Sequence, residues 1–476
     1  MKAVKIILSL LLVACAVALI VYAGGALSNP GDVIARLDAD NLAATDSKLL
    51  KARDRALESA QDGDREKTLR NIDRYVEDFG DQLELGGQNR LDLFFYRHGP
   101  SLIAAALVVI TAALALLVSA FDSKGKYRKA GIYALLIVLL YAGIYIVENL
   151  AGASSMLMTV LKKGAIYALI AVSLNLLNGF TGLFSLGQAG FMLIGAYTYA
   201  IFTIATENRT QVYQYYNGGL VQFALPSLVA LVLAGLAAAF FASLVGLPVL
   251  RLKSDYLAIA TLGFAEIIRA IFQYDGLGPL TNGSNLLRKF ATFDTALFPF
   301  AVAGVCIALI AMLIHSTYGR AFKAIRDDEV AAEAMGINLF RHKQLAFVIS
   351  SFFAGVGGAL LAMFQTTVQA SAFKSSMTYE LLLIVVIGGM GSITGSVLAS
   401  FLFIASSEWW LRFLDNTQLI GDFQVPLLRS GFRMVVFSAI IMAVVLFYRR
   451  GIMGDKEFSL KRLSQRLRGK GGSSHV

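Results

Sequence analysis

Two charged residues stand inside an apolar run and could act on a solute. Glu266 and Arg269 lie three positions apart between Leu257 and about Gln273, so a helix would place both on one face. Because charged groups in such a run are costly to bury, the pair is a candidate for lining the path of a zwitterion. A structural ion pair near the end of the segment is the alternative interpretation.

No other residue pattern indicates catalysis. Cys15 and Cys306 are the two cysteines, and both stand in apolar runs, which argues against a disulfide, a zinc site or a thiol nucleophile. The chain has no Gly-x-x-x-x-Gly-Lys-Ser/Thr phosphate loop, so it cannot hold ATP in the usual way. We therefore expect a protein that is not an enzyme, with no cofactor and no metal.

Composition places the chain in a membrane. Of its 476 residues, 57% are hydrophobic and 16% charged, and many apolar runs approach the length that crosses a bilayer as a helix. The net charge of +10 does not indicate nucleic-acid binding. The lysines and arginines gather in particular loops, as the positive-inside rule predicts for the cytoplasmic loops of a membrane protein. The prediction is an all-α, polytopic helical bundle with about eleven membrane segments.

One polar segment, from Ser316 to Phe347, separates two of these runs and must lie in water. Asp327 or Asp328 can cap a helix, and a glutamate in its first turn favours the positive end of the helix dipole. Gly336 suits the left-handed turn that closes such a helix. We expect one short helix of small apolar residues, able to lie in the groove of a partner, although an ordinary basic loop would also fit.

Glycines gather at two further places. Gly179 to Gly190 reads GFTGLFSLGQAG, and Gly388 to Gly395 reads GGMGSITG. Such density inside a membrane allows either a broken helix or close backbone packing, and the sequence leaves both open for the first stretch. The run from Tyr379 to about Leu411 is too long for one pass, so we expect it to dip in and return at the second stretch.

Three regions follow. Residues 1–150 are an extension with three membrane helices and an acid-rich, helical, periplasmic insert at about 29–97. Residues 151–454 form the glycine-rich membrane domain, and residues 455–476 a basic cytoplasmic tail, for which attraction to anionic lipid is sufficient explanation. Leu12 to Cys15 also looks like a lipoprotein cleavage box, so a processed signal peptide is the alternative to a retained first helix.

Four motifs together resemble the permease subunits of branched-chain amino acid ABC transporters, most of all the M-type subunit. They are LNLLNGFTGLFSLG from Leu174, LRLKSDYLAIATLGFAEIIR from Leu250, TNG from Thr281 and IGGMGS from Ile387. The resemblance covers roughly residues 163–454. It implies half of a bacterial inner-membrane pore, beside a second, H-type permease, two ABC ATPase subunits and a periplasmic amino-acid-binding protein, with no nucleic-acid partner.

The resemblance also assigns candidate residues. The ATPase-coupling loop would comprise Gly319, Arg320, Lys323, Arg326, Asp328, Glu329, Ala331, Ala332, Glu333 and Gly336. Independently of the resemblance, the candidates for the translocation path are Asn175, Ser185, Gln188, Glu266 and Arg269. In the general pattern a glutamate precedes the two alanines; here Val330 takes that place and Glu329 comes one position early, so Glu329 and Glu333 are both open as the acid that matters.

Two other functions fit less of the sequence. Related permeases carry urea or short amides with the same motifs, so the implied substrates are leucine, isoleucine and valine with amides as the alternative. A secondary carrier driven by an ion gradient would also have broken helices and could use Glu266, but the sequence lacks a clear duplicated architecture.

Overall fold

A computed structural model describes residues 156–251, 254–293, 295–410 and 451–454, with isolated positions elsewhere. The expected first three membrane helices, the acid-rich insert, Cys15 and the tail lie outside the described residues. Ten α-helices of six or more residues are found in the described part. They are α7 (Met156–Asn175), α8 (Gln188–Thr203), α10 (Ser227–Val249), α11 (Ser254–Gln273), α13 (Leu297–His315), α14 (Thr317–Asp327), α15 (Glu329–Ala334), α16 (Leu339–Gln365), α17 (Ser375–Gly388) and α18 (Ile393–Ile404).

Shorter elements connect them. They are α9 (Arg209–Val212), α12 (Gly278–Thr281), the 3₁₀ turns Thr206–Asn208, Gln214–Tyr216, Asp275–Leu277 and Ala370–Ala372, and the π-helical turns η1 (Leu176–Phe180) and η6 (Ala405–Trp410). A two-residue antiparallel pair joins β1 (Leu419–Ile420) to β2 (Phe423–Gln424).

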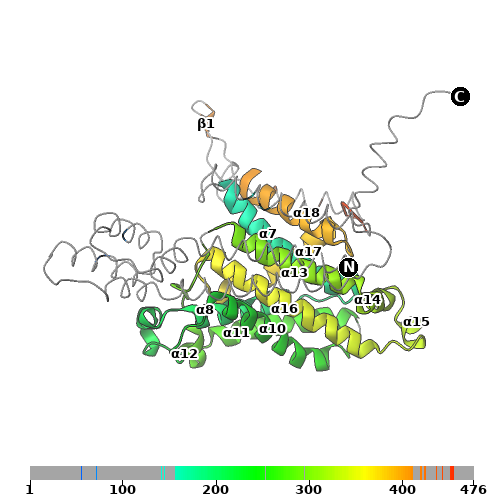
Figure 1. Cartoon of the computed structure of the whole chain (residues 1–476), viewed down its shortest axis with the longest axis horizontal. Coiled ribbons are helices and arrows are strands. Elements are labelled where there is room, and N and C mark those ends of the chain that lie inside the picture. The colour runs from blue at the N-terminus through cyan, green and yellow to red at the C-terminus, as the bar shows by residue number, and fades with distance from the viewer. Residues whose placement is uncertain are drawn as a thin grey trace, which may run out of the picture.

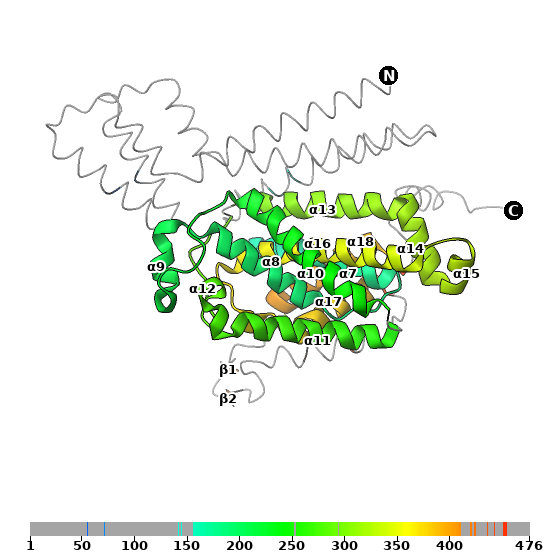
Figure 2. The same ribbon diagram turned by 90° about the horizontal axis from the view of Figure 1, so that it is seen from below.

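The long helices form one bundle with two distinct ends. α9 and α12 lie at one end and α14 and α15 at the other, and α11 and α13 run along opposite sides with α7 and α16 between them (Figures 1 and 2). Five helical segments are long and apolar enough to cross a membrane: Met156–Phe180, Ser227–Val249, Tyr256–Gln273, Leu297–His315 and Leu339–Gln365. Within the described residues these confirm a helical membrane protein; the count of eleven extends beyond them.

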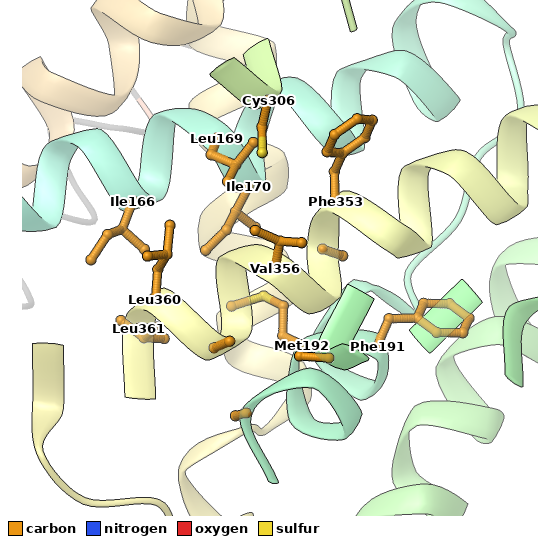
Figure 3. Close-up of a cluster of buried hydrophobic side chains, with 14 of the residues drawn as sticks. Ile166, Leu169, Ile170, Phe191, Met192, Cys306, Phe353, Val356, Leu360 and Leu361 are labelled. Carbon is orange, nitrogen blue, oxygen red and sulfur yellow. The ribbon is translucent and has the colours of Figure 1, made fainter. Parts of the chain in front are cut away.

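The core is built where small residues let helices approach. A Cβ at Gly195 of α8 would lie 2.1 Å from the carbonyl oxygen of Gly355 in α16, so only glycine allows this crossing. Figure 3 shows a cluster of buried apolar side chains from the core. They come from α7 (Ile166, Leu169, Ile170), α8 (Phe191, Met192), α13 (Cys306) and α16 (Phe353, Val356, Leu360, Leu361).

Both glycine-rich stretches interrupt helices. After α7 and η1, residues 181–187 have no regular structure before α8 begins, and the same stretch also packs closely, since a Cβ at Gly190 would lie 2.9 Å from Ala265 Cα. Breakage and close packing therefore occur together. The later run divides into α17 and α18 at Gly389 and Gly391, whose φ angles are 110° and 89°, which confirms the predicted break in that run.

Candidate functional site

The short helix predicted in the polar segment is α15. Asp328 is its N-cap and accepts hydrogen bonds from the backbone of Val330 at 2.9 Å and Ala331 at 3.0 Å. Gly336 ends it with a φ of 83°, where its N–H donates to Glu333 O at 2.9 Å. Both terminal signals are confirmed, and they matter because a helix of six residues has little stability of its own.

The residues before α15 form a second helix, α14, which was not predicted from the sequence. In α14, Phe322 and Ile325 are buried while Arg320 and Arg326 are exposed, so the segment is amphipathic with the period of a helix. Gly319 allows a tight corner after α13, because a Cβ there would lie 2.1 Å from Ile314 O.

α15 turns one small residue inward and the rest outward. Ala332 is 4% exposed, whereas Val330 is 77% and Met335 83% exposed. The exposed remainder includes Ala331, Glu333 and Gly336. Apolar side chains this open on a capped helix form a surface that a protein partner can cover. We call this surface, made of Val330, Ala331, Glu333, Ala334 and Met335, the α15 face.

Two of the basic residues on α14 point back to the bundle. Arg326 Nη1 donates to Gly179 O at 3.2 Å, and Arg326 also pairs with Asp327 at 3.0 Å. Lys323 Nζ lies 5.5 Å from the centre of the Phe180 ring, within the range of a cation–π contact. Both contacts end on η1, so α14 is attached to the last turn of the α7 segment.

Side chains satisfy several backbone groups of the irregular residues 181–187. Ser185 N donates to Asn178 Oδ1 at 3.2 Å, and Leu186 N donates to Thr261 Oγ1 at 3.0 Å. Ala189 N, in the first turn of α8, donates to Thr378 Oγ1 at 3.1 Å. An interrupted backbone in a membrane protein needs such partners, because lipid offers none.

Three candidate path residues, Asn175, Ser185 and Gln188, are buried in these networks. Gln188 Nε2 donates to Ser173 Oγ at 2.8 Å, and Asn175 Nδ2 donates to Ser392 O at 2.9 Å and Ser396 Oγ at 2.8 Å. All three candidates are at most 2% exposed. They hold the two breaks against their surroundings.

Glu266 and Arg269 form the predicted pair on α11. Arg269 Nη2 lies 2.5 Å from Glu266 Oε2, and the two side chains are 28% and 38% exposed for Arg269 and Glu266 respectively. Ser375 Oγ, at the start of α17, donates to the other oxygen of Glu266. The pair is thus fixed in place yet accessible, unlike the other three candidates. The structure brings it together with α17 and not with the α15 face.

Several partners of the broken segments were not predictable from the sequence. Thr261 and Thr378 are polar residues in apolar helices, and each accepts a hydrogen bond from the backbone at or next to the first break. Ser392 and Ser396, at the start of α18, accept hydrogen bonds from Asn175. Their polarity was the available signal, but nothing local indicates which backbone they meet. A missed ion pair joins Lys163 of α7 to Glu408 of η6 at 2.5 Å. Among the described residues, no group of three or more His, Cys, Asp or Glu could hold a metal ion.

The comparison with protein families identifies the chain. The family described as branched-chain amino acid transport system / permease component matches residues 156–446. The chain belongs to this family. The match begins with α7 and covers the broken segments, the charged pair on α11 and the α15 face, so the family accounts for the bundle as a whole.

Curated relatives agree. The chain is 29% identical over 384 residues to the high-affinity branched-chain amino acid transport system permease protein LivM of Salmonella typhimurium, covering 74% of this chain and 80% of the relative. The LivM of Escherichia coli K12 is 34% identical over 289 residues, which are 54% of this chain and 64% of the relative. The LivH permease of E. coli K12 is 24% identical over 307 residues, covering 62% of this chain and 93% of the relative. No solved structure matches.

This membership and the apolar helices make the chain a multi-pass protein of the inner membrane and a transport permease subunit. The relatives are permeases and none is an enzyme by its printed name, in agreement with the expectation from the sequence. The two kinds of relative, LivM and LivH, point to a pair of related permeases in one transporter.

Proposed function

We propose that this chain is the M-type permease of an ATP-driven importer of leucine, isoleucine and valine. Separate ATPase subunits bind the α15 face and drive its movement. The observation that carries the proposal is the combination of a capped, exposed α15 with contacts from α14 to η1. A displacement of α15 is thereby passed to the α7 segment.

The partners follow from the same division of labour. A second, H-type permease completes the pore, two ATPases lie below the α15 end of the bundle, and a periplasmic binding protein delivers the amino acid at the α9 end. The absence of a phosphate loop from the full sequence requires that ATP be bound by another chain. In this arrangement residues 151–454 form the permease domain, residues 1–150 an added extension and residues 455–476 a cytoplasmic tail.

For the acid that contacts the ATPases we favour Glu333. Glu329 is already paired with Lys343 at 2.6 Å, whereas Glu333 lies on the exposed α15 face. Of the path candidates, Glu266 and Arg269 are the ones that a passing zwitterion could meet, because their side chains are partly accessible. Asn175 and Ser185 support the path by bonding the backbone of the breaks, and Gln188 supports it by tying the start of α8 to Ser173 of α7.

The test begins with purification from mild detergent. Two ATPases and a second permease should accompany the full chain, and proteoliposomes with the binding protein should take up labelled leucine only when ATP is inside with the ATPases. Uptake that continues without ATP under an ion gradient would make the chain a secondary carrier. If the companion binding protein binds urea or a short amide and not leucine, the proposed substrate is wrong. The proposed ATP-driven permease mechanism would still stand.

A further inference from the structure

We propose that Arg326 and Asn175 are positioning residues of one mechanical relay, which carries movement of α14 into the break between α17 and α18. This proposal rests on the proposed function, because an ATPase must move α15 for the relay to act. It assigns to Arg326 a task directed into the bundle, where the resemblance placed it only in a docking loop.

The first step of the relay is the contact between Arg326 and Gly179. Gly179 is in η1, whose carbonyl groups lack the regular partners of an α-helix. Thr181 Oγ1 donates to Leu176 O at 2.9 Å and Leu183 N to Leu177 O at 3.1 Å, while Arg326 serves Gly179 O at 3.2 Å. A guanidinium at the negative end of a helix is also favoured electrostatically. A side chain of α14 therefore supplies a hydrogen-bond donor that η1 lacks.

The second step is the packing of Gly179 against Asn175 and Gly391. A Cβ at Gly179 would lie 1.8 Å from Asn175 Oδ1 and 2.5 Å from Gly391 N. No side chain separates these groups, so the backbone of η1 touches the hydrogen bond between the other two residues directly. A shift of η1 cannot be absorbed by a change of rotamer.

The third step is the hold of Asn175 on the break. Its Oδ1 accepts from Gly391 N at 2.9 Å, and its Nδ2 donates to Ser392 O and Ser396 Oγ. Asn175 is fully buried, and an unmade hydrogen bond there would be expensive. Asn175 thus ties the first break in the chain to the second, although they are far apart in sequence.

The break is able to respond. Gly389 and Gly391 both have positive φ, and glycine changes its backbone angles at lower cost than any other residue. If ATP draws α14 away from the bundle, the pull passes through Gly179 and Asn175 to the turn between α17 and α18. α17 also begins at Ser375, the residue that holds Glu266, so the relay ends on the element that borders the accessible charged pair.

The experiment separates positioning from docking. We would compare Arg326→Gln, Arg326→Lys, Asn175→Ala and the double variant Arg326→Gln with Asn175→Ala in the complete transporter. The readouts are leucine taken up per ATP hydrolysed, ATPase recovered with the chain, and hydrogen exchange of the Gly391 amide. Arg251→Gln, which removes an exposed guanidinium outside α14 and the α15 face, is the matched control.

We expect Arg326→Gln and Asn175→Ala each to lower uptake per ATP about three- to tenfold, with normal ATPase recovery. The double variant should transport no less per ATP than the more impaired of the two single variants, because both substitutions remove the same connection. Arg326→Lys should restore part of the loss. In Arg326→Gln the Gly391 amide should exchange faster even in the chain purified alone. In the complete transporter, exchange of this amide should no longer change when ATP is added.

Additive losses, or unchanged exchange at Gly391 in Arg326→Gln, would overturn the relay. If Asn175→Ala fails to insert, Ser396→Ala replaces it, since it removes only one acceptor of the Asn175 amide. Loss of ATPase recovery in Arg326→Gln with normal exchange would make Arg326 a docking residue. Failure of the wild-type chain to bring down any ATPase would instead defeat the proposed function, and the exchange measurement on the chain alone keeps the two failures distinct.

Discussion

Lys343 Nζ lies 2.6 Å from Glu329 Oε2, so the first residue of α15 is tied to the start of α16. The Lys343 side chain is 13% exposed and that of Glu329 is 51% exposed. An ion pair this open contributes at most about 1 kcal/mol. Its main effect is on direction, because it fixes which side of α15 faces outward.

The cap should matter more to α15 than this ion pair does. Asp328→Ala removes two hydrogen bonds to the helix start, a loss of about 1 kcal/mol for such a cap, whereas Glu329→Gln removes only a partly exposed charge. Hydrogen exchange of residues 329–336 should therefore rise roughly fivefold in the first variant and little in the second. Equal exchange in the two variants would contradict the assigned cap.

The turn at Gly336 should tolerate asparagine and resist valine. A Cβ there would meet nothing within 4 Å, so any cost comes from the positive φ of 83°, which β-branched residues rarely adopt. Gly336→Val should reduce ATPase recovery while membrane insertion stays normal. Gly336→Asn is the control, and a similar loss in both variants would mean that the open space at Gly336 is filled by a partner.

Ala332 and Ala331 distinguish the two sides of α15. Ala332→Asp places a charge at a buried position, so it should detach α15 from the bundle and raise exchange throughout residues 329–336. Ala331→Asp places the same charge on the exposed α15 face. It should lower ATPase recovery with exchange of the isolated chain unchanged. The reverse pattern would show that α15 is turned the other way.

Close helix packing can be tested at Gly195. Gly195→Ala forces a Cβ toward the backbone of Gly355, which should separate α8 from α16 and lower the apparent melting temperature of the isolated chain. Gly263→Ala is the matched control, since no atom lies within 4 Å of a Cβ there and alanine favours a helix by about 1 kcal/mol over glycine. A stable Gly195→Ala chain would mean that the crossing is looser than the structure shows.

The charged pair on α11 should affect transport more than assembly. We expect Glu266→Gln and Arg269→Gln to slow leucine uptake by roughly tenfold, as loss of a charge-assisted contact does, with normal recovery of both permeases. Ser375→Ala, which removes only the hydroxyl on Glu266, should have a smaller effect. Unchanged uptake in the first two variants would leave the pair with a structural role or none.

Features set by local chemistry were predictable. The cap at Asp328, the turn at Gly336 and the pairing of Glu266 with Arg269 each depend on residues within a few positions of one another. The break after α17 followed from the length of the apolar run and its glycines. In each case sequence spacing and spatial spacing are nearly the same, so the pattern carries the geometry.

Features set by distant contacts were not predictable. Asn175 is one polar residue in an apolar helix, and nothing near it in sequence names Ser392 or Ser396 as its partners. α14 was missed because its charges resembled those of a loop, while its helix is stabilised by burial of Phe322 and Ile325 against the bundle. Such arrangements depend on how helices pack, which a single sequence does not specify.

The last described turn of the chain, residues 451–454, closes the C-terminal end of α17. Ile452 N donates to Ile387 O at 2.7 Å and Met453 N to Gly388 O at 3.2 Å, although both donors follow the residues matched by the family. A truncation that appears safe from family boundaries would therefore leave two carbonyl groups without donors beside the glycine break. Affinity tags belong after Gly454. A deletion that reaches Gly451 should destabilise the end of α17, more than fifty residues earlier in the chain.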